Sequence, residues 1–289
     1  MLLNASGCLD ALTAPDTARM FDAFVTKTVT PLHRAGNAPV RIAETDVGML
    51  NSIGLANPGR ERFLAETLPR LRGLGMPLWV SVGGFSAREY AETCAVLEDV
   101  TIELNLSCPN VDEAPESAAD IVGACRAVTE LPLYAKLSPA AWDIAEVARA
   151  VEAAGADGLS LVNTLRGMKL DADFRPVLGT ATGGLSGPAL KPVALAAVHA
   201  CFRATRLPIV GMGGVASGGD VLELFAAGAS AVALGTVLFS DPSAPSRIRA
   251  ELDAELAARG LSSVEEACGI AHENALPRRK HLDVKSRVS

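Results

Sequence analysis

Eight short apolar runs are spaced along the chain, and segments of helical composition separate them. Short apolar runs without polar interruptions are typical of parallel strands that are covered on both faces. Strict alternation of strand and helix predicts a parallel sheet, and eight repeats favour a closed (β/α)8 barrel over a doubly wound open sheet. The predicted strands are Leu2–Ala5, Phe24–Thr28, Leu78–Val82, Ile102–Leu106, Leu133–Leu137, Leu159–Asn163, Pro208–Met212 and Val232–Val237.

The segments between these runs are rich in Ala, Leu and Glu, which favour helix. Asp143 and Asp220 lie where an acidic residue would cap or begin a helix, and Gly155 and Gly228 lie where helices end. We expect one domain spanning residues 1–289, since α/β barrels are commonly this long. The predicted helices are Glu61–Leu74, Ala87–Leu97, Ala118–Val128, Ala145–Ala153, Pro192–Phe202 and Gly219–Ala227.

Two long segments, Pro31–Gly59 and Leu165–Lys191, interrupt the alternation and are rich in Gly, Pro, Asn and Thr. Long loops inside a compact domain are usually functional. Both follow predicted strands, so we expect them on the C-terminal face of the barrel, where barrel active sites lie.

Charge and composition exclude several classes of partner. A net charge of −7 argues against nucleic acid, which requires a basic face. No apolar run reaches the roughly 18 residues that span a bilayer, and the start of the chain lacks a basic signal region. The six cysteines form no C-x-x-C pair, and the four histidines show no metal-ligand spacing. We therefore expect a cytoplasmic protein with reduced thiols and no metal.

Polar residues end several of the predicted strands. Lys27, Asn105, Lys136, Asn163 and Thr164 all lie at such ends, which converge on one pocket in a barrel. Two converging lysines favour an anionic ligand such as a phosphate or a carboxylate. The alternative is that each lysine extends to solvent.

Glycines follow the last two predicted strands. Gly213-Gly214 and Gly235-Thr236 lie where many barrels bind phosphate through backbone amides and a helix N-terminus. Glycine has no side chain, so a phosphate can approach the backbone closely. Ordinary turn chemistry is the alternative.

Cys108 differs from the other cysteines because it follows a strand and precedes Pro109. It could act as a nucleophile, a proton-transfer base or a redox thiol. Nearby cations would lower the pKa of its thiol. No histidine lies beside it in the sequence to activate it as a nucleophile. Cys94, Cys125 and Cys201 lie on predicted helices and are expected to be inert, and His33 is expected at the surface.

At these residues the chain resembles the class 1 dihydroorotate dehydrogenases along nearly its whole length. The match is an ordered set of motifs, which is far more specific than any one of them. The segments are Ala5-Ser6-Gly7, Thr26 to Thr30, Gly48 to Gly59, Asn105 to Val111, Ala135 to Pro139, Val162 to Met168, Thr182 to Pro188 and Gly211 to Val215.

The resemblance implies an FMN barrel that oxidises dihydroorotate to orotate in pyrimidine biosynthesis. Cys108 would be the base, taking a proton from C5, and Lys136 would stabilise the charge that develops as FMN receives the hydride. Implied FMN contacts are Ala5, Ser6, Gly7, Lys27, Thr28, Asn105, Lys136, Val162, Gly187, Gly213, Gly214, Gly235 and Thr236. Implied substrate contacts are Lys27, Asn51, Ile53, Gly54, Leu55, Asn105, Asn110, Asn163 and Thr164.

The motifs most resemble class 1B, which implies a second subunit carrying FAD and a 2Fe-2S cluster, electron transfer to NAD, and a homodimeric core. Class 1A, which uses fumarate, is the nearer alternative. Two features differ from the family: the first strand begins almost at Met1, without the usual hairpin, and the segment from Val111 to Ser117 after Cys108 is short. They leave open a related FMN enzyme for another dihydropyrimidine or enoate, or a non-catalytic barrel that binds FMN or phosphate.

Overall fold

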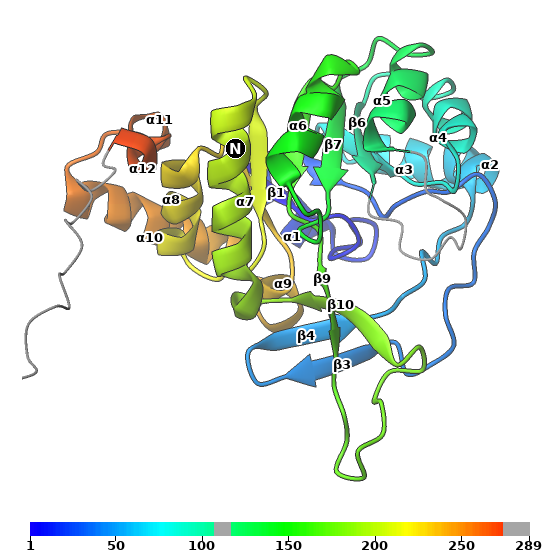
Figure 1. Ribbon diagram of the computed structural model, residues 1–289, viewed down its shortest axis with the longest axis horizontal. Helices are drawn as coiled ribbons and strands as arrows, with labels where there is room; N and C mark the ends of the chain where they lie inside the picture. Colours follow the sequence, from blue (N-terminus) through cyan, green and yellow to red (C-terminus); the bar gives the residue numbers. More distant parts are fainter. Residues whose placement is uncertain (107–116, 274–289) are drawn as a thin grey trace, which may run out of the picture.

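The computed structural model describes residues 1–106 and 117–273 and shows a nearly closed parallel barrel surrounded by helices (Figure 1). Eight strands pair in the order β1-β12-β11-β8-β7-β6-β5-β2. The predicted (β/α)8 barrel is therefore confirmed, and the doubly wound sheet is excluded. The strands are β1 (Leu2–Asn4), β2 (Phe24–Val25), β5 (Leu78–Val82), β6 (Thr101–Asn105), β7 (Leu133–Leu137), β8 (Gly158–Leu161), β11 (Ile209–Met212) and β12 (Ala231–Leu234).

A buried side chain closes the ring between β1 and β2. Asn4 Nδ2 donates to the carbonyl oxygen of Val25 at 2.8 Å, and the Val25 amide donates back to Asn4 Oδ1 at 2.9 Å. A parallel bridge between Leu3 and Ala23 adds to this contact. The asparagine thus replaces ladder hydrogen bonds that two short strands do not supply.

Several strands end earlier than predicted. β2 ends at Val25 instead of Thr28, and β12 ends at Leu234, so Gly235 and Thr236 follow the strand instead of lying in it. Beyond β2 the backbone still bonds to β5, because the amides of Thr26 and Val29 donate to carbonyl oxygens of Trp79 and Ser81. The sequence pattern therefore predicted a longer strand, up to Thr28.

Helices cover the outside of the barrel, and their ends match the predicted signals. Asp143 caps α6 by accepting hydrogen bonds from the amides of Ala145 and Glu146. Ser217 and Asp220 form a capping box on α8, and Gly228 ends that helix at φ 115°. The helices on this layer include α3 (Leu68–Arg72), α4 (Ala87–Cys94), α5 (Ala118–Arg126), α6 (Ile144–Ala153), α7 (Lys191–Ala204) and α8 (Gly218–Ala227).

Other helical elements were not predicted. The longest is α10 (Ala244–Arg259), which buries Ala244, Ile248 and Leu256. Apolar and charged residues lie on all sides of this helix, so its sequence shows no clear apolar stripe. The predicted helix Glu61–Leu74 divides into α2 (Arg60–Arg62), the π-helical η1 (Phe63–Thr67) and α3. The remaining short elements are α1 (Pro15–Ala18), η2 (Pro188–Leu190), α9 (Val237–Ser240), α11 (Val264–Ala267) and α12 (Ile270–Glu273).

The two long segments predicted as loops form a second sheet, which corrects that prediction. Its strands are β3 (Ile42–Thr45), β4 (Gly48–Asn51), β9 (Leu165–Met168) and β10 (Thr182–Ser186), and they pair antiparallel in the order β3-β4-β10-β9. The sheet stands beside the barrel, and the β9–β10 connection projects from it (Figure 1). Two antiparallel pairs of consecutive strands, β3–β4 and β9–β10, are joined by the pairing of β4 with β10. That pairing spans more than a hundred residues, so local sequence does not indicate it.

The core has an outer and an inner part. The larger cluster packs between the strands and the helices, while a smaller one fills the inside of the barrel. Within the smaller cluster, the rings of Trp79 and Tyr134 lie 4.4 Å apart. In the described ranges no helix is long and apolar enough to cross a membrane.

Candidate active site

A layer of polar side chains follows the apolar inner cluster toward the C-terminal ends of the strands. Side chains alternate along a strand, so the residue two after each inward-facing one also faces inward. Trp79 is followed in this way by Ser81, and Tyr134 by Lys136. Lys136 is paired in register with Asn105 on one side and with Ser160 on the other. The barrel interior thus changes from apolar to polar within one step of the pleat.

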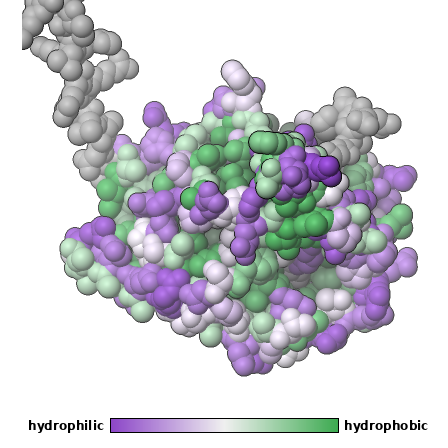
Figure 2. Space-filling view, turned by 90° about the horizontal axis from the view of Figure 1, so that it is seen from below, coloured by the Kyte–Doolittle hydropathy of each residue, from purple (hydrophilic) through white to green (hydrophobic). Residues whose placement is uncertain are grey.

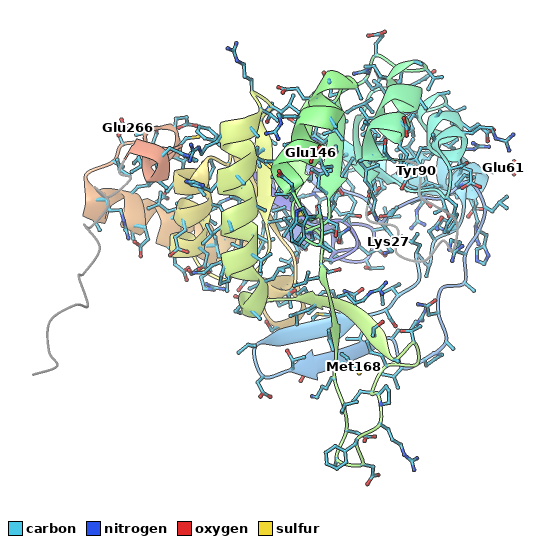
Figure 3. The ribbon with its side chains drawn as sticks, viewed as in Figure 1. Lys27, Glu61, Tyr90, Glu146, Met168 and Glu266 are labelled. Atoms are coloured by element: carbon cyan, nitrogen blue, oxygen red, sulfur yellow. The ribbon has the colours of Figure 1, made fainter. Side chains whose placement is uncertain are left out.

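The structure brings the two predicted lysines together. Lys136 is buried at 5% exposure, while Lys27 is partly buried and close enough for its charge to be affected by Lys136. In Figure 3, Lys27 lies on the part of the barrel nearer the antiparallel sheet. The alternative in which both lysines extend to solvent is therefore wrong for Lys136.

A buried carboxylate accompanies these cations. Glu103 on β6 is 1% exposed, and its Oε1 accepts a hydrogen bond from Lys136 Nζ at 3.4 Å. Sequence analysis missed this residue, although a glutamate inside the apolar strand Ile102–Leu106 was a visible signal. A charge in that position is retained only if it is paired.

Burial shifts the titration of the groups around Lys136. It lowers the pKa of the Lys27 ammonium; the Cys8 thiol opposes this shift and Lys136 adds to it. Burial also raises the pKa of Cys8, which both lysines oppose. Two lysines, one thiol and one carboxylate therefore lie close together beneath the opening of the barrel.

An amide network connects three strand ends. Asn105 Nδ2 donates to Thr28 Oγ1 at 3.2 Å, and Asn163 Nδ2 donates to Asn105 Oδ1 at 3.0 Å. Thr28 also lies within hydrogen-bond distance of Ser81. Tyr90 on α4 donates to the carbonyl oxygen of Asn105 at 2.6 Å (Figure 3). These contacts fix the orientation of two predicted substrate residues.

The segment after β1 lies against the same lysines. Ser6 Oγ donates to the carbonyl oxygen of Thr26 at 2.8 Å. Gly7 has φ +78°, and a Cβ there would lie 3.0 Å from the side chain of Lys27. A Cβ on Gly235 would lie 3.5 Å from Cys8 Sγ and from Ala5 Cβ. Predicted cofactor residues from β1, β2 and β12 therefore meet in one place.

Three predicted glycines gather beside the start of α7. A Cβ on Gly214 would lie 2.7 Å from the amide nitrogen of Lys191 and 2.9 Å from the carbonyl oxygen of Gly187. Gly213 has φ +125° and Gly214 has φ +76°, which disfavour other residues. Thr236 Oγ1 donates to Ser186 Oγ at 2.8 Å and connects this region to β10.

The antiparallel sheet supplies the opposite side of the site. Asn51 Nδ2 donates to the carbonyl oxygen of Gly184 at 3.3 Å. Gly184 also adjoins Thr164, since a Cβ on it would lie 2.1 Å from Thr164 Oγ1. After β4, the carbonyl oxygens of Ile53 and Leu55 accept hydrogen bonds from Asn37 and Asn57. Gly54 and Leu55 both have positive φ, so this segment has a specific, constrained path.

The remaining residues singled out from the sequence lie elsewhere in the fold or outside its described part. Val162 is buried, and its amide donates to the carbonyl oxygen of Met212 at 2.9 Å. His33 is exposed, as expected, and Cys94, Cys125 and Cys201 are buried. Cys108 and Asn110 lie outside the described residues.

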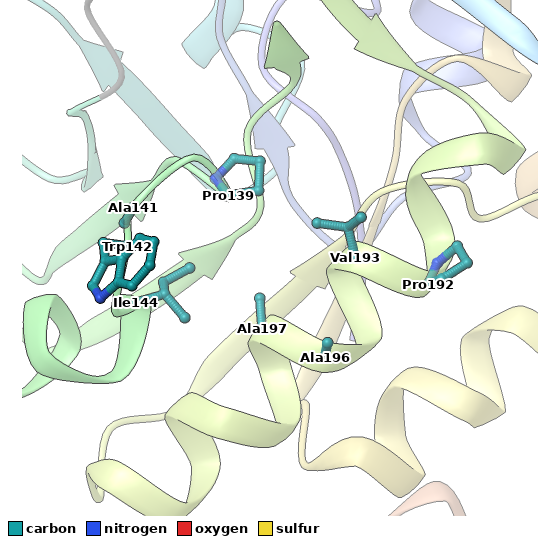
Figure 4. A pocket seen from close by; sticks show the side chains of 8 residues that line it. All are labelled: Pro139, Ala141, Trp142, Ile144, Pro192, Val193, Ala196 and Ala197. Carbon is teal, nitrogen blue, oxygen red and sulfur yellow. The ribbon is translucent and has the colours of Figure 1, made fainter.

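A surface hollow of about 410 Å³ lies between the segment that leads into α6 and the first turns of α7 (Figure 4). Its walls include the exposed Trp142. It contains none of the predicted site residues.

The barrel mouth fits a flavin with a phosphate tail. Two lysines and several amides face one region, and a cradle of three glycines, Gly187, Gly213 and Gly214, adjoins the N-terminus of α7. The hydroxyl of Ser160, in register with Lys136, is buried and has no hydrogen-bond partner in the described residues. Within 1–106 and 117–273, no cluster of His, Cys, Asp or Glu could hold a metal ion.

Known proteins similar to this chain share one description. The sequence model of the family "Dihydroorotate dehydrogenase" matches residues 1–256. The "Dihydroorotate dehydrogenase B (NAD(+)), catalytic subunit" of Latilactobacillus sakei is 47% identical over 275 residues, covering 89% of each chain. That of Listeria welshimeri is 43% identical over 282 residues, covering 92% of each. A crystal structure of DHODH from Eimeria tenella in complex with ferulenol has a TM-score of 0.78 at 23% identity, covering 94% of this chain and 85% of that one, and supports the fold.

Proposed function

The chain belongs to the dihydroorotate dehydrogenase family, as a class 1B enzyme, and we propose that its barrel oxidises dihydroorotate to orotate with FMN as cofactor and Cys108 as base. The joint presence of Lys27, Lys136 and the Asn105–Asn163 pair at one barrel mouth carries this proposal. The lysines can bind an anion, and the asparagines can form hydrogen bonds with the amide groups of a planar ring.

When bound, FMN supplies the acceptor for the hydride that leaves C6 of dihydroorotate. Lys27, Thr28, Asn105, Lys136 and Val162 would hold its ring system. Gly187, Gly213, Gly214, Gly235 and Thr236 would hold its phosphate end, with Ala5, Ser6 and Gly7 closing the remaining side. Gly187, Gly213 and Gly214 support this division, because they lie beside the N-terminus of α7 and have no room for a Cβ.

In this proposal Lys136 acts through the positive charge of its ammonium. Its ammonium is buried in the polar layer, where a fixed charge acts more strongly than it would in water. It stabilises negative charge that develops on a bound group and needs no reorganisation to do so.

The asparagines orient the substrate. Asn105 and Asn163 are bonded to each other, and Asn51 is bonded to β10, so their amides present fixed donors and acceptors. A ring with a different pattern of carbonyl and N–H groups would leave these polar groups unpaired, which a buried site discriminates against strongly. We assign Ile53, Gly54, Leu55, Asn110 and Thr164 to the same substrate pocket.

Cys108 would take the proton from C5. The assignment is supported by its place in the motif from Asn105 to Asn110, directly after the strand that carries Asn105. Lys27 and Lys136 supply positive potential at the end of this part of the barrel, and positive potential favours a thiolate.

A substrate comparison tests the proposal. Purified protein with bound FMN would be given dihydroorotate, dihydrouracil or an enoate, together with an excess of an artificial electron acceptor. We expect acceptor reduction with dihydroorotate and formation of orotate. Turnover only with another dihydropyrimidine or an enoate would contradict the substrate, and a protein that cannot bind FMN would contradict the cofactor.

The class also suggests an assembly. We propose a homodimeric core joined by a subunit with FAD and a 2Fe-2S cluster that passes electrons to NAD. The names of the relatives support a second subunit, since they are described as catalytic subunits of NAD(+)-linked enzymes. Exposed apolar residues of the antiparallel sheet, including Ile42, Val47 and Met168, support burial of that face on assembly. Figure 2 shows hydrophobic residues gathered on the face seen from below.

A further inference from the structure

We propose that Glu103 is a positioning residue for Lys136: its carboxylate holds the buried ammonium in place and keeps it positively charged. The inference rests on the proposed function, because it concerns the charge that this site offers to a flavin and its substrate. Glu103 itself is not assigned a contact with either.

Strand register places Glu103 beneath Lys136. Glu103 pairs with Tyr134, and Lys136 pairs with Asn105, so the carboxylate belongs to the layer nearer the N-terminal ends of the strands. The ammonium therefore receives its counter-charge from below, at 3.4 Å, while the side facing the barrel mouth stays available to a ligand. Both side chains are nearly inaccessible, at 7% and 1% exposure.

The other titratable groups near Lys136 do not stabilise its charge. Lys27, which follows β2, repels it, and Cys8, which follows β1, is held in the neutral form by burial. Ser160 on β8 is neutral and lacks a hydrogen-bond partner in the described residues. Among those residues, Glu103 makes the ion pair of Lys136.

Lys27 shows what burial does to a lysine in this place. It has no ion pair in the described part of the chain, and burial lowers the pKa of its ammonium. Lys136 is more deeply buried, so removal of its carboxylate partner would impose the same penalty without compensation. Its ammonium would then lose its proton at lower pH and no longer offer a positive charge to the ligand.

The test measures the Lys136 ammonium directly. Lysine ε-carbons are labelled with ¹³C in the FMN-loaded protein, the Lys136 resonance is assigned with Lys136→Met, and its chemical shift is followed against pH. In Glu103→Gln, which keeps the shape but removes the charge, we expect proton affinity to fall at least about tenfold, one pH unit in the midpoint. An unchanged midpoint would overturn the proposal.

Two further variants separate charge from packing. Glu103→Asp keeps the charge and loses a methylene, so charge positioning predicts a midpoint between wild type and Glu103→Gln. If packing alone mattered, Glu103→Asp would disturb Lys136 more than the isosteric glutamine, which would contradict the proposal. Glu146→Gln, at an exposed position on α6 (Figure 3), is the control and should leave the midpoint unchanged.

The aspartate variant keeps the proposal testable if Glu103→Gln does not fold. Glu103→Asp is then compared with wild type alone, and a Lys136 midpoint that does not move would overturn the inference. Dihydroorotate oxidation by the same wild-type preparation is assayed separately. Absence of that activity would contradict the proposed function, whereas the midpoints judge the role of Glu103.

Discussion

At the residue scale, the main feature is the buried charge of Lys136 and Glu103 at the barrel mouth. One step of the pleat separates Tyr134 from Lys136 and Trp79 from Ser81, so apolar packing ends directly beneath the polar layer. Burying ionisable groups costs free energy, and sites that retain them are usually functional. Sequence analysis identified the lysines because they end apolar runs. It missed Glu103, although a glutamate inside an apolar strand was a visible signal, and only the register across the strands places it below Lys136.

Replacement of Cys108 by alanine tests the base at this scale. Cys108→Ala should still bind FMN, because the thiol is not among the cofactor contacts, but turnover with dihydroorotate should fall at least about 100-fold, as expected for loss of a general base. Flavin content and steady-state turnover check the prediction. Cys268→Ala, a partly buried cysteine near the end of α8, is the control and should retain both properties. Near-normal turnover of Cys108→Ala would remove Cys108 from the mechanism.

At the scale of helices and strands, sequence patterns predicted the elements that are determined by neighbouring residues. The eight barrel strands and the caps at Asp143 and Gly228 were predicted because periodicity and end signals reside in neighbouring residues. The antiparallel sheet was not, since its strands are short, three of them contain glycine, and its two halves pair across distant segments. The predicted location of these segments on the C-terminal face was informative nevertheless, because Asn51 lies in one of them and Gly184, in the other, adjoins Thr164.

Gly184 on β10 tests whether that sheet shapes the substrate site. In Gly184→Ala the new Cβ would collide with Thr164, so we expect a higher KM for dihydroorotate and a loss of about 1–3 kcal/mol in the free energy of unfolding. Steady-state kinetics and denaturant unfolding measure the two effects.

Gly123 provides the matched control. It lies within α5 with open space around its Cβ position, so Gly123→Ala should stabilise the protein by about 0.5–1 kcal/mol through helix propensity and leave KM unchanged. Kinetics for Gly184→Ala equal to those of Gly123→Ala would show that the sheet does not shape the site.

A stacked histidine pair connects α7 with α12. His199 and His272 have ring centroids 4.1 Å apart, and burial lowers the pKa of His199 below about 6.5, assisted by His272 and Arg203. Because the folded state disfavours the charged ring, the unfolded state binds more protons below that pH and stability falls on acidification. The free energy of unfolding should therefore decrease less in His199→Gln than in wild type between about pH 7.5 and pH 5.5. Equal decreases in the two proteins would show that His199 does not cause the loss of stability in acid.

At the scale of the whole molecule, the proposed assembly predicts how electrons leave the site. The catalytic chain alone should oxidise dihydroorotate with an artificial acceptor but not reduce NAD, because we assign the polar residues of the barrel mouth to one flavin and one substrate. Addition of the iron-sulfur flavoprotein subunit expected for class 1B should restore NAD reduction. Co-purification and NADH absorbance measure this. NAD reduction by the isolated chain, or turnover that depends on fumarate, would contradict the assignment of the acceptor.

The most direct test of the whole account is a single turnover without oxygen. Dihydroorotate is mixed anaerobically with the FMN-loaded protein, the visible flavin absorbance is followed, and orotate is quantified after quenching. The account predicts rapid loss of the flavin absorbance, with orotate formed in an amount equal to the flavin reduced. A flavin that stays oxidised in the presence of dihydroorotate, while an artificial reductant bleaches it, would contradict the central claim.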